Sequence, residues 1–222
     1  MEDGSVRGVV VGGEDRPFDT VIATLQPPAL RRLLPPSLHG LLEAYPRRYL
    51  GVVCVVLKVR ASLTPYYAIN VCEPTPITTV VETSHVVGTD HTDGLRLVYL
   101  PKYCEPDAPE HDEDDELLLE RFLAMLGRMV HDLRRDEVVD WTVQRAKLVE
   151  PVHPLGARPR VAPVWPGVPG LALASSAQVY PRLLNGESVI TLAEDVAGQA
   201  AERLGLAPGG RPAAAPPEEV AA

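Results

Sequence analysis

The chain has 222 residues and a formal net charge of −9, with 45% hydrophobic and 23% charged residues. A chain of this length and composition is predicted to be globular and to bury a real core, as one large domain or parts of two. The acidic balance, without any run rich in lysine and arginine, argues against a nucleic-acid partner. The polar N-terminus is not that of a signal peptide, and the longest apolar stretch, Tyr49–Val59, is too short and too β-branched to span a bilayer.

The cysteines indicate the redox environment. Cys54, Cys72 and Cys104 lie far apart in the sequence and form no CxxC pair. An odd, scattered set indicates reduced thiols rather than a disulfide framework. We therefore expect a cytoplasmic protein.

The first segment is predicted to form a β-hairpin. Val6–Val11 is strand-like, Gly12–Asp15 is the expected turn, and Phe18–Thr24 is the expected returning strand. The glycines in this region do not have the GxGxxG spacing of a dinucleotide-binding turn, and Pro17 with a second strand follows where the helix should start. This segment is therefore not predicted to hold a nucleotide.

The middle of the chain is rich in β-branched residues. Two short helices, Ala29–Leu34 and Leu38–Ala44, are expected before it. Tyr49–Arg60 is predicted to be a central strand buried on both faces for much of its length. Three further strands are expected at Tyr66–Val71, Ile77–Ser84 and Leu95–Leu100. Since their connections are too short for crossover helices, these strands should pair largely antiparallel.

A connection between two of these strands contains potential metal ligands, namely His85, Asp90, His91 and Asp93. Aspartate and histidine beside glycine are also ordinary turn residues, and no second ligand cluster supports a metal site. We therefore predict no metal.

A buried helix and another strand follow. Asp112–Val130 begins with acidic residues, which suit a helix N-terminus, and has a broad apolar stripe. Val138–Val149 is predicted to be a strand with Trp141, Val143 and Arg145 on one face. Pro151–Pro169 is a proline-punctuated connector.

The last ordered part of the chain is predicted to be a strand, a loop and a helix. Leu171–Ala174 is an apolar run bounded by turn residues, which favours a strand. From Ser188 onward, apolar residues recur at helical spacing, which predicts a helix with one buried face, formed by Val189, Leu192, Val196 and Ala200. The free N–H groups at the start of this helix favour a negatively polarised ligand, although this unit also occurs in proteins without any ligand there.

Several ordered blocks resemble a known family. They are Phe18–Thr24, Tyr49–Cys54, Tyr66–Asn70, Val81–Thr83, Tyr99–Tyr103 and Gly170–Pro181 with the helix after it. Together these blocks are similar to the C-terminal portion of flavin-dependent amine oxidases, a group that includes protoporphyrinogen oxidase-like and phytoene desaturase-like enzymes. The resemblance covers nearly the whole chain up to Leu204, and its final block is the most specific.

The resemblance implies an α/β fold, with a mixed, mostly antiparallel substrate-domain sheet and the C-terminal part of a Rossmann-like FAD-binding domain. The expected parts are a partial FAD-domain and hairpin segment (1–34), a substrate-binding domain (35–137), the C-terminal part of the FAD-binding domain (138–204) and a disordered tail (205–222). The tail is too rich in glycine, proline and alanine to bury a core.

The resemblance also implies positions for FAD contacts. Ser175 and Ser176 correspond to the loop near the pyrophosphate of FAD. Glu187, Ser188 and Val189 correspond to the start of the last helix, whose N–H groups would face the pyrimidine edge of the flavin.

Two further residues, Gln178 and Tyr180, correspond to positions near the flavin or the entrance for substrate. The sequence departs from the family at Ala174-Ser175-Ser176, where many members have Gly-Asp. It also contains no GxGxxG, so the expected protein is a truncated enzyme, half of a split gene, or a module that requires a chain supplying the N-terminal dinucleotide-binding unit.

Two functions are compatible with these features. One is an FAD-dependent oxidoreductase that moves a hydride from a C–N or C–C bond of a small-molecule substrate to the flavin, and that is inactive as an isolated chain. The other is a non-catalytic, partner-binding remnant of the same fold. The sequence identifies neither the substrate nor a catalytic residue.

Overall fold

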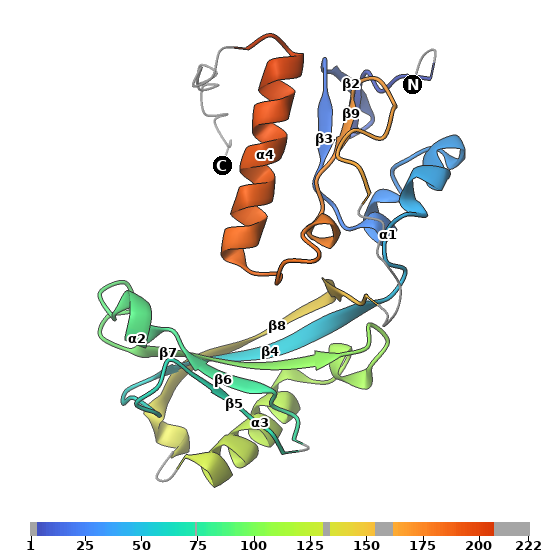
Figure 1. The fold of residues 1–222 in the computed structure, drawn as a ribbon. Helices are drawn as coiled ribbons and strands as arrows, with labels where there is room; N and C mark the ends of the chain where they lie inside the picture. Colours follow the sequence, from blue (N-terminus) through green and yellow to red (C-terminus); the bar gives the residue numbers. More distant parts are fainter. Residues whose placement is uncertain (1–3, 74, 131–133, 154–161, 207–222) are drawn as a thin grey trace. The chain divides into compact units, whose positions relative to one another are not determined.

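A computed structural model of the chain describes residues 4–73, 75–130, 134–153 and 162–206 (Figure 1). The chain divides into two compact units. One consists of residues 1–46 and 155–222, the two ends of the chain, and is called here the terminal unit. The other, Arg47–Pro154, is called the sheet unit.

The sheet unit contains five antiparallel strands in the order β5-β6-β7-β4-β8. Their bounds are Tyr49–Val59 for β4, Ala68–Asn70 for β5, Thr79–Glu82 for β6, Arg96–Cys104 for β7 and Val138–Pro151 for β8. The mixed α/β fold with a mostly antiparallel sheet is therefore confirmed, since every strand pair of this sheet is antiparallel.

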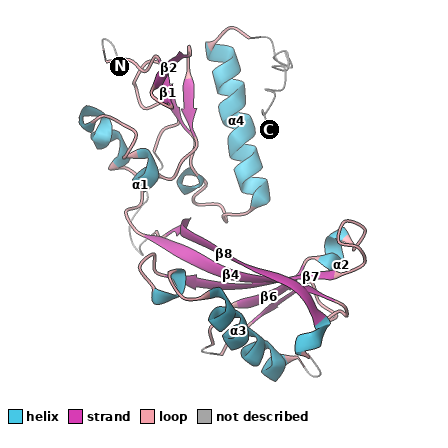
Figure 2. Cartoon of the chain, turned by 180° about the vertical axis from the view of Figure 1, so that it is seen from behind, coloured by secondary structure: helices cyan, strands magenta, loops and turns pink. Residues whose placement is uncertain are grey.

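Helix α3, Asp115–Met129, covers one face of this sheet (Figures 1 and 2). Its apolar stripe is buried against alternate residues of β4, β7 and β8, with Phe122 and Val55 among the fully buried side chains. The alternation in β4 is regular: odd-numbered residues are buried and even-numbered ones half-buried. The prediction that β4 is buried on both faces was therefore wrong, since within this unit one helix layer covers one face only.

Helix α3 begins with a side-chain cap. The carboxylate of Asp114 accepts hydrogen bonds from the backbone N–H groups of Glu116 and Leu117. Arg145 of β8 donates to the carbonyl of Glu113 at 2.7 Å and forms an ion pair with Asp115 at 2.6 Å. These contacts explain why the helix starts three residues later than the acidic run suggested.

The terminal unit begins with a hairpin whose strands are β1, Gly8–Val11, and β2, Glu14–Pro17. The predicted hairpin exists, but its returning strand was predicted wrongly. Gly12 and Gly13, both with positive φ, form a two-residue turn, so the chain reverses at once. The segment predicted to return contains β3, Val21–Ala23, which pairs with the distant strand β9 instead.

Strands β3 and β9, Leu171–Leu173, form a two-stranded parallel sheet. Helix α4, Gly186–Arg203, runs alongside β3 (Figures 1 and 2). Short helical segments complete the unit, namely α1 (Pro27–Leu30), η1 (Pro36–Leu42) and η4 (Ser176–Gln178). An apolar cluster that includes Leu30, Tyr45 and Leu173 joins segments from both ends of the chain.

The boundaries of these units differ from the predicted parts. Residues 138–151 were expected in the partial FAD domain, but β8 pairs with β4 along most of its length and belongs to the sheet unit. Residues 35–46 lie in the terminal unit rather than with the sheet. The predicted tail falls almost entirely outside the described residues, at 207–222, and so does the part of the predicted connector at 154–161.

The connection considered for a metal forms short turns. It includes helix α2, Ser84–Val87, and His85 contacts Thr64 and Glu82. Among the described residues, no group of three or more histidine, cysteine or carboxylate side chains could hold a metal ion.

None of the described helices is long and apolar enough to cross a membrane. Two more short segments, η2 (Pro109–His111) and η3 (Arg135–Glu137), flank α3.

Candidate functional site

The predicted site residues follow the carboxyl end of β9. Because β3 and β9 are parallel, their carboxyl ends lie at the same edge of the small sheet. Gln26 follows β3, and Ser175 follows β9. Ligands of open α/β sheets bind outside the carboxyl ends of the strands, so this edge is the first place to examine.

A hydrogen-bond network joins the two strand ends. Ser175 Oγ donates to Gln26 Oε1 at 3.0 Å, and Gln26 Nε2 donates to Ser176 Oγ at 2.7 Å. The structure therefore joins the consecutive residues Ser175 and Ser176 to Gln26, the N-cap residue of α1. Sequence analysis missed Gln26, since nothing in its local pattern indicates a partner 149 residues away.

Ser175 and Gln178 form a capping box around η4. The Ala177 N–H donates to Ser175 Oγ at 3.3 Å, and the Ser175 N–H donates to Gln178 Oε1 at 2.7 Å. Gln178 Nε2 in turn donates to the carbonyl of Ala162 at 3.0 Å. Ser175 and Gln178 are only 3% and 7% exposed. Their polar atoms thus shape the loop, and the less buried Ser176 is the better placed of the two serines to meet a ligand.

The start of α4 is capped by a side chain of its own. Asn185 Oδ1 accepts a hydrogen bond from the Ser188 N–H at 2.9 Å, so this N–H group is already engaged. Glu187 adds a carboxylate in the first turn, where negative charge is favoured. The sequence could have revealed this cap, because asparagine immediately before Gly186-Glu187-Ser188 is a preferred N-cap residue.

The buried face of α4 is shorter than predicted. Val196 and Ala200 are buried, but Val189 is 40% exposed and Leu192 only half-buried. The prediction of a continuous buried stripe was therefore wrong for the first turns of the helix. Within the described residues, no apolar layer covers Val189 or the neighbouring Ile190.

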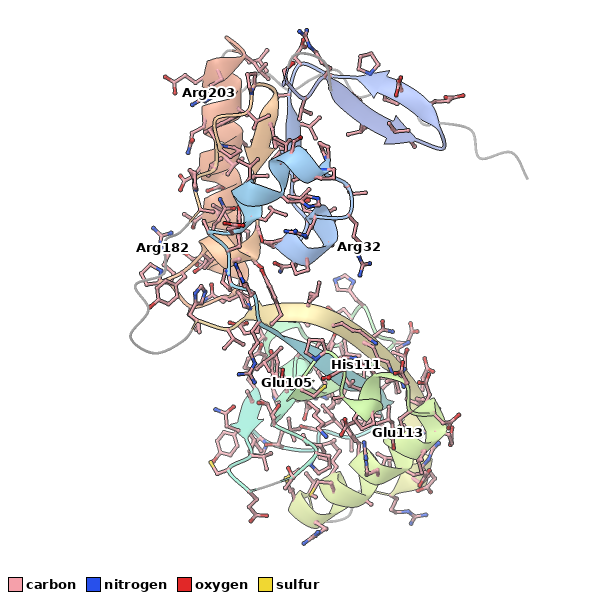
Figure 3. The ribbon with its side chains drawn as sticks, turned by 90° about the vertical axis from the view of Figure 1, so that its right-hand side faces the viewer. Arg32, Glu105, His111, Glu113, Arg182 and Arg203 are labelled. Atoms are coloured by element: carbon pink, nitrogen blue, oxygen red, sulfur yellow. The ribbon has the colours of Figure 1, made fainter. Side chains whose placement is uncertain are left out.

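Tyr180 lies half-buried in the connection between η4 and α4. The exposed Arg182 follows it in the same connection (Figure 3). These positions place Tyr180 within the segment that the family resemblance associated with the flavin or substrate entrance.

Two hollows of the terminal unit lie at the opposite end of the small sheet, where β3 and β9 begin. One of about 540 Å³ is lined by residues before β3 and before β9, including Arg7, Asp19 and Gly170. In a second hollow, of about 470 Å³, Arg203 stacks on Trp165 at 4.3 Å. Neither contains a predicted site residue. The candidate site lies at the end of the small sheet where β3 and β9 finish. It is chosen because the polar loop and the start of α4 lie there, and not for the volume of a hollow.

The sheet unit has an open face opposite α3. The register aligns Val52 with Tyr103 and Val56 with Tyr99 on this face, and Cys54 lies between these two rows. Burial raises the pKa of the Cys54 thiol to about 11, so the thiol is protonated at neutral pH and is a poor nucleophile. Besides Val52, Val56 and the two tyrosines, this face carries polar residues of β8, with Thr142 opposite Val56 and Gln144 opposite Cys54. The ion pair of Lys58 with Asp140 lies near one end.

Comparisons with known proteins gave matches to solved structures. No family model and no curated protein matched the sequence. A protein from Exiguobacterium, provisionally named a protoporphyrinogen oxidase, has 19% identity and a TM-score of 0.66, with 91% of this chain and 45% of that chain covered. Reduced UDP-galactopyranose mutase has 14% identity and a TM-score of 0.57, with 92% and 46% covered.

An FAD-dependent oxidoreductase from Pseudomonas aeruginosa is also similar, with 20% identity, a TM-score of 0.53, and 97% of this chain and 53% of that chain covered. The chain thus spans about half the length of these structures. At such low identities the likeness shows the fold alone. It confirms that the chain has the fold of one portion of proteins of the FAD-dependent oxidoreductase type, as the sequence blocks indicated.

Proposed function

We propose that the chain forms the C-terminal half of an FAD-dependent oxidoreductase of the amine oxidase type. The observation that carries this proposal is the way the chain is divided. Its two ends meet as the parallel pair β3 and β9, and the segment between them forms a separate antiparallel sheet. This arrangement fits a flavin domain interrupted by a substrate domain.

The residues at the carboxyl edge fit part of an FAD site. Ser176 offers a hydroxyl group beside the buried Ser175–Gln178 cap, and the first turn of α4 offers backbone N–H groups. Such donors suit a pyrophosphate or the carbonyl groups of a flavin ring. The 222 residues contain no GxGxxG, so the usual pyrophosphate-binding turn must come from outside them.

FAD, when bound, supplies the acceptor for a hydride from a C–N or C–C bond. The role we assign to this chain is to position the substrate and to shield it from water. In the proposal, the open face of the sheet unit, with Val56, Tyr99 and Tyr103, holds a small-molecule substrate. Apolar and aromatic side chains exclude water and orient a substrate without requiring a charged group.

The partner in this proposal is a βαβ unit that carries the Gly-rich turn, either on a second chain or as another part of one polypeptide. The protein is proposed to work in a reducing compartment such as the cytoplasm. All three cysteines are free thiols, and Cys72 is exposed.

One observation favours a second candidate, a non-catalytic, partner-binding remnant. The hydrogen-bonding groups of Ser175 and Gln178 and the N–H of Ser188 all have partners inside the chain. A loop satisfied in this way holds its shape without any ligand.

Flavin binding separates the two candidates. The chain is purified alone and also as a fusion with a GxGxxG-bearing βαβ unit of a flavin-dependent amine oxidase placed before Met1. We expect no bound-flavin absorbance from the chain alone, because several charge-assisted hydrogen bonds of about 1.5–3 kcal/mol each are missing. The fusion should bind flavin. A folded fusion that stays colourless favours the remnant, and a yellow isolated chain contradicts the need for a partner.

A further inference from the structure

Strand β3 has one edge that faces β9 and one that does not. The Val21 N–H donates to the Gly170 carbonyl, and the Ala174 N–H donates to the Ala23 carbonyl, both at 2.9 Å. Successive residues of a strand direct their backbone groups to opposite edges. The N–H and carbonyl of Ile22 therefore point away from β9, and β9 is the only strand neighbour of β3 in the described part of the chain.

The far edge of β9 is covered by the chain itself. The Leu173 N–H donates to the Val164 carbonyl at 2.7 Å, and the Leu171 N–H donates to the Val168 carbonyl at 3.2 Å. Strand β9 therefore has neighbours on both sides, β3 and the segment that contains Val164 and Val168. The open edge of the small sheet therefore belongs to β3.

The surroundings of this edge are apolar and lack the usual protection of an edge strand. Ile22 is 40% exposed, and Phe18 and Leu25 on either side of β3 are exposed as well. The strand itself, Val21-Ile22-Ala23, contains no lysine, proline or bulge that would discourage pairing. Helix α4 cannot satisfy the edge, because its backbone groups are used within the helix.

We infer that the outer edge of β3 accepts a parallel strand, with the backbone of Ile22 at the centre of the pairing. This inference rests on the proposed function, because it specifies where the partner's βαβ unit attaches. A parallel sheet of two strands is incomplete, since such sheets normally have more strands and helices on both faces. The exposed Val189 and Ile190 on α4 offer apolar surface in the same unit for a helix of the incoming segment.

Two observations favour a βα segment over a second copy of this chain. The compared structures are about twice as long as this chain, which matches 45–53% of them. In addition, two copies related by a two-fold axis would pair their β3 edges in the antiparallel direction. Strands β3 and β9 are parallel, so a further strand that continues this sheet runs parallel to β3. Parallel strands are joined by a crossover connection, usually a helix, which a βα segment supplies.

The first test measures amide hydrogen exchange in the isolated chain. We expect the Ile22 amide to exchange at least about tenfold faster than those of Val21 and Ala23, because only the latter two are bonded to β9. Slow exchange of the Ile22 amide in a monomer would overturn the inference, since the edge would already be covered. Slow exchange in a dimer alone would show that the occupant is a second copy.

The second test uses the fusion with the βαβ unit and two variants. Proline is tolerated in an edge strand where the N–H faces solvent, so Ile22→Pro should leave the isolated chain folded. In the fusion, Ile22→Pro should lower the thermal stability, because it removes the N–H of β3 that faces the added strand. The matched control, Ile22→Thr, keeps the N–H and the β-branched shape and should retain the pairing.

The two proposals fail separately. If the Ile22 amide becomes protected in a fusion that stays colourless, strand pairing at the outer edge of β3 is supported and flavin binding is not. If the fusion binds flavin while the Ile22 amide still exchanges fast, the pairing at β3 is contradicted and the proposed function is retained. A fusion without a cooperative thermal transition contradicts strand pairing at β3, because a strand added there should complete the sheet.

Discussion

The hydroxyl of Ser175 donates a hydrogen bond to the side chain of Gln26, 149 residues earlier in the chain, at a distance of 3.0 Å. Gln26 follows β3 and Ser175 follows β9, so this one bond ties together the two strand ends at the candidate site. Since Ser175 is almost fully buried, it has no access to water as an alternative partner. The loop at the site is thus held by a contact between the two ends of the chain.

Gln26→Leu should destabilise the terminal unit by about 1–3 kcal/mol, because it removes the acceptor of the buried Ser175 hydroxyl and the donor to Ser176 Oγ. Chemical unfolding monitored by circular dichroism measures the change. Gln144→Leu is the control: the exposed side chain of Gln144 donates to Thr142, two residues away, so its loss should cost less than about 0.5 kcal/mol. Equal effects of the two substitutions would contradict the structural role of Gln26.

Gly51→Ala should destabilise the sheet unit by about 1–3 kcal/mol. A Cβ atom at this position of β4 would lie 2.8 Å from both the Ala146 carbonyl oxygen and Nε2 of the buried His111, which lies beside the sheet (Figure 3). The control is Gly127→Ala in the exposed face of α3, where a Cβ atom meets nothing within 4 Å. Because alanine favours a helix, this control should raise stability by about 0.5–1 kcal/mol. Thermal unfolding of both variants tests the pair.

The ion pair between Lys102 and Glu110 should make stability depend on acid pH. The hydrogen bond from Lys102 is the main reason that the pKa of Glu110 lies below its usual value. A carboxyl group with a lowered pKa in the folded state contributes stability above its unfolded pKa of about 4.3, and this contribution is lost as the pH falls through the folded value.

Lys102→Met should therefore cost about 1 kcal/mol at pH 7, and the difference from the unaltered protein should shrink below about pH 4. Urea unfolding across this range gives the comparison. Lys58→Met is the control, since its pair with Asp140 lies at 3.4 Å between exposed side chains and should contribute less than about 0.5 kcal/mol. A difference that stays constant with pH would rule out the linkage to Glu110.

The thiols should differ in reactivity at neutral pH. Cys72 is exposed, whereas burial raises the pKa of Cys54 to about 11 and also raises the pKa of Cys104. The thiolate is the reactive form, so iodoacetamide at pH 8 should modify Cys72 first in the folded chain. Mass spectrometry identifies the modified peptide, and denaturant should make the other two thiols reactive. Early modification of Cys54 would contradict its burial.

Much of the fold follows from local sequence patterns. The β-branched run in β4, the short connections around it and the apolar stripe of α3 each specify an element without reference to the rest of the chain. The returning strand of the hairpin shows the limit of such patterns. Its residues have strand character, but their partner is β9, and pairing over this separation depends on tertiary contacts that a local pattern does not contain.

The sequence predicted where the candidate site lies along the chain but not the contacts that shape it. Sequence analysis located Ser175, Ser176 and the helix start because turn residues and helical periodicity mark them. It did not show that Gln26 bonds to both serines, because a polar contact between distant segments leaves no periodic signal. It also treated Val189 as buried. Helical spacing identifies an apolar face but does not say whether this chain supplies the surface that covers it.

The start of α4 permits a test that separates stability from flavin binding. The family resemblance implied that the N–H groups of Glu187, Ser188 and Val189 face the flavin, and Ser188→Pro removes one of them. In the structure, this group donates to Asn185 Oδ1, so Ser188→Pro should first destabilise the isolated chain through loss of the cap. Asn185→Ala removes the same hydrogen bond but leaves the Ser188 N–H free, and should cost about 1 kcal/mol.

Because both substitutions remove one shared bond, their combined effect on stability should be smaller than the sum of the single effects. Flavin titration of the fusion then distinguishes two roles of the N–H group. If a flavin oxygen replaces Asn185 as its acceptor, Asn185→Ala should retain binding while Ser188→Pro weakens it severalfold. If both variants lower the flavin affinity equally, the N–H acts through the shape of the helix start and makes no direct contact with the cofactor.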